Sequence, residues 1–391
     1  MKNFYKIFLF TYLLFLPFTS IGIKIGNFKL TISDSLIMFF FISSFFLKKS
    51  THSKLNNFFK ITLIFLLLVS FSIIKTISVQ QFIMALLPWI YSLILIYSFS
   101  ILLKKIKLEA IFRLTYSSII INIILSTIIV ILYKFFGLDI LNTLNNNFGG
   151  RYTYFTINPN QNVFYLINMA SILLLINIYQ NKYSKYLIHI ILIMIFPVLE
   201  TGSRTGFILY ILILILSLFY LILNKQKSHV FILVIIFLFL QNNLNSLFES
   251  SNSTMRAISV LNKINNDPQI EGASGESIDL GKELFLKNPF FGIGLGNFHK
   301  NYYQYEIHNT FISLLAETGI VGFCGFLILL FYIFYSIFKS KNKKFKFFAF
   351  IIMCIFLISN TAHFVLRERW IWILFIFIIF LSNFKKNYVR N

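Results

Sequence analysis

The sequence predicts an all-α integral membrane protein of about twelve transmembrane helices, on three observations. The chain of 391 residues is 58% hydrophobic and only 12% charged, with a mean hydropathy of +0.79. Its apolar residues form runs close to the length of about 17–25 residues that a helix needs to cross a bilayer. Lys and Arg concentrate in alternate connections between these runs, which is the bias typical of cytoplasmic loops.

Each apolar run is expected to form one membrane helix. The runs, in chain order, are 4–23, 30–47, 58–74, 81–103, 114–136, 161–179, 186–199, 207–223, 228–241, 312–338, 347–363 and 370–384. The two short runs, 186–199 and 228–241, indicate helices that are tilted, partly re-entrant or longer than the run itself. The first run begins with Lys2 and Lys6, as a signal peptide does, but no clear small-residue cleavage site follows it. We therefore expect a retained anchor.

The basic residues predict the orientation. With the N-terminus inside, the predicted cytoplasmic segments are the start of the chain, 48–57, 104–113, 180–185, 224–227, 339–346 and the tail. Together with Lys60 at a helix entry they hold 22 of the 35 Lys and Arg residues, and only Glu109 opposes them. We therefore predict a multi-pass membrane protein of twelve spans with both termini in the cytoplasm. The net charge of +22 is then explained by topology and by anionic membrane lipids, so no nucleic-acid partner is indicated.

The domain organisation is expected to be simple. Residues 1–391 are predicted to form a single polytopic membrane domain, with one large outer loop, 242–307, between helices 9 and 10. This loop is expected to contain a short helix at 276–287. The sequence holds no D-x-D, no H-E-x-x-H, no clustered outer carboxylates and no Walker-type loop. We therefore expect no metal, no nucleotide and no cofactor.

The most informative motif is H-N-x9-G-x-x-G, where the large loop meets an apolar helix. It consists of His308, Asn309, Gly319 and Gly322. A His at a membrane surface takes and gives up a proton near neutral pH, which suggests catalysis. The simpler reading is that His308 caps the helix. Gly319, Gly322 and Gly325 recur every third residue, which favours close helix packing.

Arginines on the outer side form the second signal, because positive-inside bias works against them. The outer hairpins contain Arg151, Arg204, Arg256, Arg367 and Arg369. Arg is suited to bidentate contact with phosphate, so several of them facing a His predict a pyrophosphate clamp beside a base. For Arg367 and Arg369, an interfacial anchor with nearby Trp residues and an acceptor-site role stay equally open.

Glu317 and the remaining histidines complete the candidates. An acid at the top of a span is functional by default. Glu317 lies nine residues after His308, about half a turn out of phase on a helix, so we expect it to pair with an Arg of a neighbouring hairpin. His299 is expected to be solvated, whereas His189 and His363 are expected to satisfy buried hydrogen bonds.

Three segments together resemble the O-antigen ligase and polymerase superfamily. They are Thr201-Gly202-Ser203-Arg204, the Gly-rich run 292–298, and His308-Asn309-Thr310-Phe311 with 315–322. The resemblance implies a glycosyltransferase of the bacterial inner membrane with the C-type fold and a periplasmic active site, so that the outer loop 242–307 would lie in the periplasm. Such proteins take a glycan from undecaprenyl pyrophosphate. They pass it to a sugar hydroxyl without a metal, inverting the anomeric carbon.

The resemblance also implies roles for individual residues. His308 would be the general base on the acceptor hydroxyl, and Arg204 and Arg256 would hold the pyrophosphate. Arg151 is added because it is predicted on the same side of the membrane. Asn309, Glu317, Gly319 and Gly322 are expected to support the site.

Two alternatives within the family, and two outside it, stay open. A ligase and a polymerase share the donor and differ in the acceptor, which is lipid A core in one case and a lipid-linked repeat unit in the other. The complete motif favours the ligase. A transporter of lipid-linked glycans is less consistent with polar groups gathered at one outer face. A non-catalytic scaffold leaves the outer Arg and His residues unexplained.

Overall fold

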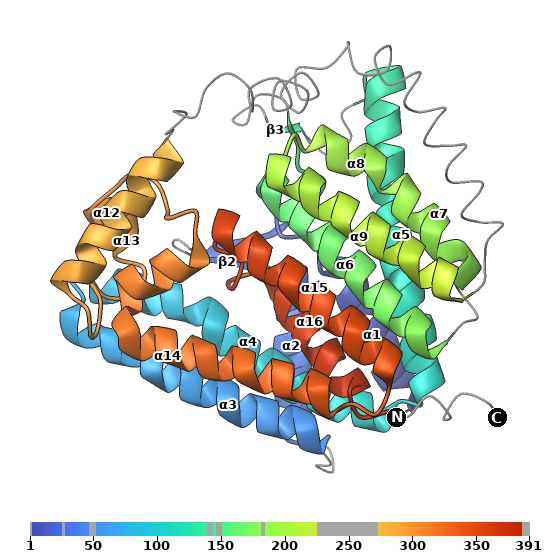
Figure 1. Ribbon diagram of the computed structural model, residues 1–391, viewed down its shortest axis with the longest axis horizontal. Helices are drawn as coiled ribbons and strands as arrows, with labels where there is room; N and C mark the ends of the chain where they lie inside the picture. The colour runs from blue at the N-terminus through green and yellow to red at the C-terminus, as the bar shows by residue number, and fades with distance from the viewer. Residues whose placement is uncertain are drawn as a thin grey trace. The chain divides into compact units, whose positions relative to one another are not determined.

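The computed structural model describes residues 2–25, 28–46, 52–138, 144–145, 151–180, 184–224 and 273–384 (Figure 1). The chain divides into two compact units that alternate along the sequence. Unit 1 consists of Met1–Tyr12, Gly22–Ile111 and Gln269–Asn391, and unit 2 of Leu13–Ile21 and Phe112–Pro268. The expectation of one membrane domain over residues 1–391 stays a prediction.

Helices dominate both units, with two small antiparallel hairpins. Unit 1 holds most of α1 (Lys2–Phe15), the hairpin β1 (Gly22–Ile25) and β2 (Phe28–Thr31), and α2 (Ile32–Ser44), α3 (Ser53–Ser70), η1 (Phe71–Lys75), α4 (Val79–Lys105), α12 (Ala273–Lys287), α13 (Phe298–Asn301), α14 (Thr310–Lys339), α15 (Lys343–Ala362) and α16 (Arg369–Leu381). Unit 2 holds most of α5 (Leu108–Phe136), the hairpin β3 (Leu144–Asn145) and β4 (Arg151–Tyr152), and α6 (Pro159–Tyr179), α7 (Ser184–Ile193), α8 (Ile195–Glu200) and α9 (Arg204–Leu223).

Seven helices in the described part of the chain are long and apolar enough to cross a membrane. They are Ser53–Lys75, Val79–Lys105, Leu108–Tyr133, Pro159–Tyr179, Arg204–Leu223, Thr310–Lys339 and Lys343–Ala362. Four shorter apolar helices fall on the predicted runs 4–23, 30–47, 186–199 and 370–384. The all-α membrane class is thereby confirmed. The run 228–241 lies outside the described residues, and the count of twelve spans stays a prediction.

Two predicted runs differ from the helices that form on them. The run 4–23 is not one helix, because α1 ends at Phe15 and the β1–β2 hairpin begins at Gly22. Pro17 explains the end, since a residue before proline is disfavoured in helical conformation. The run 186–199 is broken at Met194 into α7 and α8, and Pro197 lies in the first turn of α8, where proline is tolerated.

The ends of the helices in unit 1 lie in two groups, at opposite ends of the unit. At one end, Tyr332 of α14 donates to the Lys54 carbonyl at 2.9 Å, and the Lys54 ammonium donates to Ser382 beyond α16 at 3.2 Å. The His52 amide donates to Ser100 of α4 at 3.0 Å, close to Lys104 and Lys105 at the end of that helix. This basic end holds segments that were predicted to be cytoplasmic.

The opposite end of unit 1 carries the candidate site. The side-chain nitrogen of Asn297 donates to the Thr76 hydroxyl, and its side-chain oxygen Oδ1 accepts from the Ser78 backbone amide at 2.9 Å. The segment 288–309 is thereby attached to the connection between η1 and α4. The start of α14 and the α15–α16 connection lie at the same end, joined by a hydrogen bond of 2.7 Å from Thr310 to the His363 carbonyl.

Candidate functional site

Asn309 fixes the start of α14 and ties it to α15. Its side-chain oxygen accepts from the Ile312 amide at 3.0 Å, and its side-chain nitrogen donates to the Thr361 carbonyl at 3.2 Å. The N-cap of α14 is therefore Asn309 and not His308, so the simpler reading of His308 as a helix cap is wrong.

His308 lies directly before this cap and is half-buried. Its ring is 5.3 Å from the His363 ring, centroid to centroid, and the two planes are inclined at 76°. His363 is the C-cap of α15, so the α14 start and the α15 end bring two imidazoles together.

Gly319 breaks α14 close to the site. Its φ of 64° and ψ of −169° are not helical, and Ile320 and Val321 donate to the carbonyls of Pro289 and Phe290 instead of to their own helix. A Cβ on Gly319 would lie 2.3 Å from the Phe290 carbonyl oxygen. Gly319 is therefore required by a backbone crossing, and its interpretation as a helix-packing residue is wrong.

Two different contacts explain why the other two positions of the repeat, Gly322 and Gly325, are glycine. A Cβ on Gly322 would lie 2.2 Å from the Thr318 hydroxyl oxygen, one turn earlier in the same helix. A Cβ on Gly325 would lie 3.1 Å from side-chain atoms of Phe65 and Leu68 on α3. Close packing between helices therefore accounts for Gly325 alone among the three.

Glu317 is buried beneath the segment that crosses α14. Its side chain is only 4% exposed, and it accepts backbone hydrogen bonds from Gly296 and Phe298. An oxygen of its carboxylate lies 3.8 Å from a guanidinium nitrogen of Arg367, in the α15–α16 connection. The expectation that Glu317 pairs with an Arg of a neighbouring hairpin is confirmed.

Arg367 joins Glu317 to a second acid, Glu306. The Arg367 guanidinium donates to the Glu306 carboxylate at 2.8 Å and also lies over the Phe364 ring, 4.5 Å from its centroid. The positive charge of Arg367 holds the pKa of the Glu306 carboxyl below its usual value, and His299 and His308 act in the same direction. One cation therefore organises two carboxylates at this end of unit 1.

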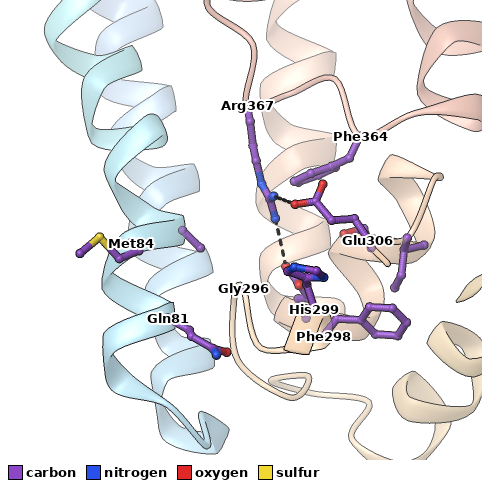
Figure 2. Close-up of a pocket in the computed structure, with 12 residues that line it drawn as sticks. Gln81, Met84, Gly296, Phe298, His299, Glu306, Phe364 and Arg367 are labelled. Carbon is purple, nitrogen blue, oxygen red and sulfur yellow. Dashed lines mark hydrogen bonds and ion pairs between the residues drawn. The ribbon is translucent and has the colours of Figure 1, made fainter. Parts of the chain in front are cut away.

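A cavity of about 160 Å³ opens beside this network (Figure 2). In Figure 2, Arg367 and Phe364 come from the α15–α16 connection, Gln81 and Met84 from α4, and His299 and Glu306 from the segment before α14. The lining residues are Gln81, Met84, Ala85, Gly296, Phe298, His299, Glu306, Ile307, Ser313, Glu317, Phe364 and Arg367. His299 is half-buried here, so the prediction that it is solvated is wrong.

Arg369 has a different role from Arg367. Its guanidinium binds both oxygens of the fully buried Asp34 carboxylate, with Nε to Oδ1 at 2.5 Å. Asp34 also accepts from the Thr31 amide at 2.9 Å, as the N3 residue of the capping box in which Thr31 is the N-cap of α2. Trp370 and Trp372 are 0% and 1% exposed, so the interfacial-anchor reading is wrong.

Two of the predicted phosphate-binding arginines, Arg151 and Arg204, belong to unit 2. Arg204 is the first residue of α9 and is exposed, after a tight turn in which Ser203 accepts from the Gly206 amide at 3.3 Å. Arg151 lies in β4 opposite Asn145, and the structure describes its backbone only. Arg256 lies outside the described residues. A shared clamp of these arginines with His308 stays a prediction.

A comparison with protein families identifies the central part of the chain. Residues 189–327 match the family model described as O-antigen ligase. Over these residues the chain is similar to the O-antigen ligase family. The match confirms the predicted resemblance to the O-antigen ligase and polymerase superfamily, and with the seven apolar helices it indicates a bacterial membrane protein with glycosyltransferase-like activity on lipid-linked glycans. No curated protein matches the chain.

Within the matched segment, the sequence analysis missed part of the polar network. Glu306 was not singled out, and His299 was set aside. Both residues precede His308 by fewer than ten positions, in a loop otherwise rich in aromatic and amide residues. That cluster of titratable groups just before the motif was a signal that they belong to one polar network.

Proposed function

We propose that this protein is an O-antigen ligase-like glycosyltransferase of the bacterial inner membrane. It moves a glycan from undecaprenyl pyrophosphate to an acceptor sugar hydroxyl on the periplasmic face, without a metal and with inversion at the anomeric carbon. The observation that carries the proposal is the match over residues 189–327, which contains the complete H-N-x9-G-x-x-G motif with His308 beside a polar cavity.

His308 is the general base in this proposal. A sugar hydroxyl is a poor nucleophile until its proton is removed, and general-base help contributes about 10²–10⁴-fold to such steps. His308 interacts electrostatically with Glu306, whose negative charge stabilises the positive charge that the ring gains with the proton. His363 contacts the His308 ring and restricts its orientation.

The donor is held by arginines. Arg204, Arg256 and Arg151 bind the pyrophosphate, which is already a good leaving group, so charge stabilisation replaces an acid. Arg204 supports this role because it is exposed at the start of a helix, where backbone amides also favour an anion.

The proposed topology is a C-type glycosyltransferase fold with both termini in the cytoplasm. It is supported by the sorting of helix ends in unit 1. Lys54, Lys104 and Lys339 lie at the ends of α3, α4 and α14 that are opposite the ends carrying His308 and the cavity. Positive-inside bias then puts the cavity on the periplasmic side.

The acceptor separates the ligase from the polymerase. The test is transfer from a purified undecaprenyl-pyrophosphate glycan by the full-length protein, with lipid A core and a second lipid-linked repeat offered separately, with and without EDTA. The proposal predicts product on the core with EDTA present. A ladder on the lipid-linked repeat alone would establish a polymerase instead. No product with either acceptor from folded protein would favour a transporter.

A further inference from the structure

The cavity beside Arg367 contains three buried polar atoms that lack a hydrogen-bond partner within the described part of the chain. They are Nδ1 of His299, Oε2 of Glu317 and Nε of Arg367. Buried polar atoms in folded proteins are nearly always hydrogen-bonded, and leaving one without a partner costs about 1–3 kcal/mol. Three such atoms around one cavity indicate a site built for a polar ligand.

The charges of the cavity exclude a phosphate group. Two carboxylates, Glu306 and Glu317, face the single guanidinium of Arg367, which is already engaged by both of them. An anion would meet more negative than positive groups here. The cavity therefore fits a neutral ligand that both donates and accepts hydrogen bonds, which is the property of a sugar hydroxyl.

The walls of the cavity add an apolar contribution. Phe298 and Phe364 line it from different segments, as Figure 2 shows. Aromatic rings with a few convergent polar groups are typical of small-molecule sites, and the C–H face of a sugar ring packs against such rings. A volume of about 160 Å³ holds more than a water molecule, which needs about 10–15 Å³. It is smaller than the roughly 300 Å³ of a pocket for a drug-sized ligand.

We propose that this cavity is a subsite for one neutral sugar ring of the acceptor, with hydroxyls bound by Glu317, His299 and Arg367. The assignment to the acceptor rests on the proposed function. Ile307 and Phe364 line the cavity, and they are the chain neighbours of His308 and His363. A ring bound here keeps the acceptor chain beside the imidazole, whereas the donor pyrophosphate binds elsewhere.

The test measures binding without any donor, so that it does not depend on transfer. Methyl glucoside, methyl galactoside and methyl mannoside are titrated into the full-length protein in detergent and followed by saturation-transfer NMR. Inorganic pyrophosphate serves as competitor. The variants are Glu317→Gln, which keeps the side-chain shape, and His299→Phe, which keeps an aromatic ring. The matched control is Glu283→Gln, on the exposed surface of α12.

The wild type is expected to bind at least one hexoside, and pyrophosphate is expected not to displace it. Glu317→Gln and His299→Phe should each weaken binding about tenfold or more, while Glu283→Gln binds as the wild type does. Glu317→Gln replaces a charge-assisted hydrogen bond with a weaker neutral one, and His299→Phe removes a hydrogen bond altogether. If Glu317→Gln fails to fold, His299→Phe decides alone.

Three results would overturn the subsite. They are wild-type protein that binds none of the hexosides, variants that bind as tightly as the wild type, and displacement by pyrophosphate. Hexoside binding by a protein that transfers no glycan would contradict the proposed function but support the sugar subsite. Glycan transfer by a protein that binds no hexoside would do the reverse.

Discussion

Arg367 is the residue on which the charges of the site converge. It contacts Glu306 directly, lies 3.8 Å from the buried Glu317 and covers the Phe364 ring. Removal of this guanidinium would leave two carboxylates close together without a counter-ion. The positive-inside bias disfavours an arginine on the side predicted to be outside. The two carboxylate partners of Arg367 explain why it is present there, and the pairs hold the loop before His308 against the α15–α16 connection.

The Arg367–Glu306 pair predicts a pH dependence of stability. Arg367 holds the pKa of the folded Glu306 carboxyl below its usual 4.5. A carboxyl with a lower pKa in the folded state stabilises that state above the unfolded pKa, and the contribution is lost as pH falls through the folded pKa. The unfolding temperature should thus fall more steeply below about pH 4.5 in the wild type than in Glu306→Gln.

Thermal unfolding followed from pH 7 to pH 3 checks this linkage. Arg367→Gln provides the control, since Glu306→Gln should have no further effect on the pH profile in that background. Superimposable profiles of the wild type and Glu306→Gln would show that the pair does not act on stability.

Arg204 provides a test at the donor side. Arg204→Lys keeps the positive charge at the start of α9 but loses the planar fork that contacts two phosphate oxygens. We expect kcat/KM for the lipid-linked donor to fall on the order of tenfold to a hundredfold, as for the loss of one charge-assisted hydrogen bond. Steady-state transfer at varied donor concentration measures it. Full activity of Arg204→Lys would show that Arg204 acts only through its charge or as an anchor.

For single residues, the sequence predicted the place of the candidate site and one of its contacts. The spacing of His308, Asn309 and Gly319 singled out the site, and the helical phase of Glu317 predicted its pairing with an Arg. Glu306 and His299 were missed because their roles depend on a partner far along the chain, Arg367, that local patterns do not reveal.

At the scale of elements, the main finding is that α14 is interrupted where another segment crosses it. The amides of Ile293 and Gly294 donate to the carbonyls of Ala316 and Glu317 at 2.9 and 3.0 Å, and Ile320 donates back to Pro289 at 2.8 Å. These backbone bonds hold the wall of the cavity, so the conformation of Gly319 positions Glu317.

The interruption predicts opposite outcomes for two glycines of one helix. Gly319→Ala places a Cβ 2.3 Å from a carbonyl oxygen at a positive φ, so we expect a loss of about 1–3 kcal/mol or more and a large fall in transfer. Gly325→Ala approaches only side chains of α3, at 3.1 Å, and should stay near the wild type. Thermal unfolding and transfer rates measure both. Equal effects of the two substitutions would contradict the crossing.

The sequence predicted which segments are helical better than how each helix ends or bends. The alternation of apolar and basic segments located α3, α4, α14 and α15. The kink at Gly319 was interpreted as helix packing, because an i, i+3 series of glycines is compatible with both structures until the crossing segment is known.

At the scale of the molecule, a buried ion pair joins the N-terminal and C-terminal parts of unit 1. Asp34 at the start of α2 is fully buried, and Arg369 at the start of α16 binds both of its oxygens. Every residue from Trp370 to Leu381 is buried, so α16 is the most enclosed helix of this unit in the described part of the chain.

Breaking this pair should destabilise the whole unit. Arg369→Ala leaves the Asp34 carboxylate buried without a counter-ion, which costs about 3–5 kcal/mol. Adding Asp34→Asn should restore part of the loss, because the amide still accepts from Thr31 without a charge. Detergent-phase thermal unfolding of the single and double variants measures the coupling. A double variant as unstable as the sum of both single variants would show that the two residues act independently.

The membrane class followed from composition and apolar runs because the bilayer imposes these on any sequence that crosses it. The division into two units did not, since residues far apart in the chain, such as Asp34 and Arg369, meet in one unit. The proposed catalytic role of His308 combines a motif with a position in the fold.

Transfer of an undecaprenyl-pyrophosphate-linked glycan by purified His308→Ala tests that claim most directly. His189→Ala in α7 is the matched control. We predict that His308→Ala unfolds at the wild-type temperature and loses transfer by about 10² or more, the size of a general-base contribution, whereas His189→Ala retains activity. Transfer by folded His308→Ala at the wild-type rate would contradict the account.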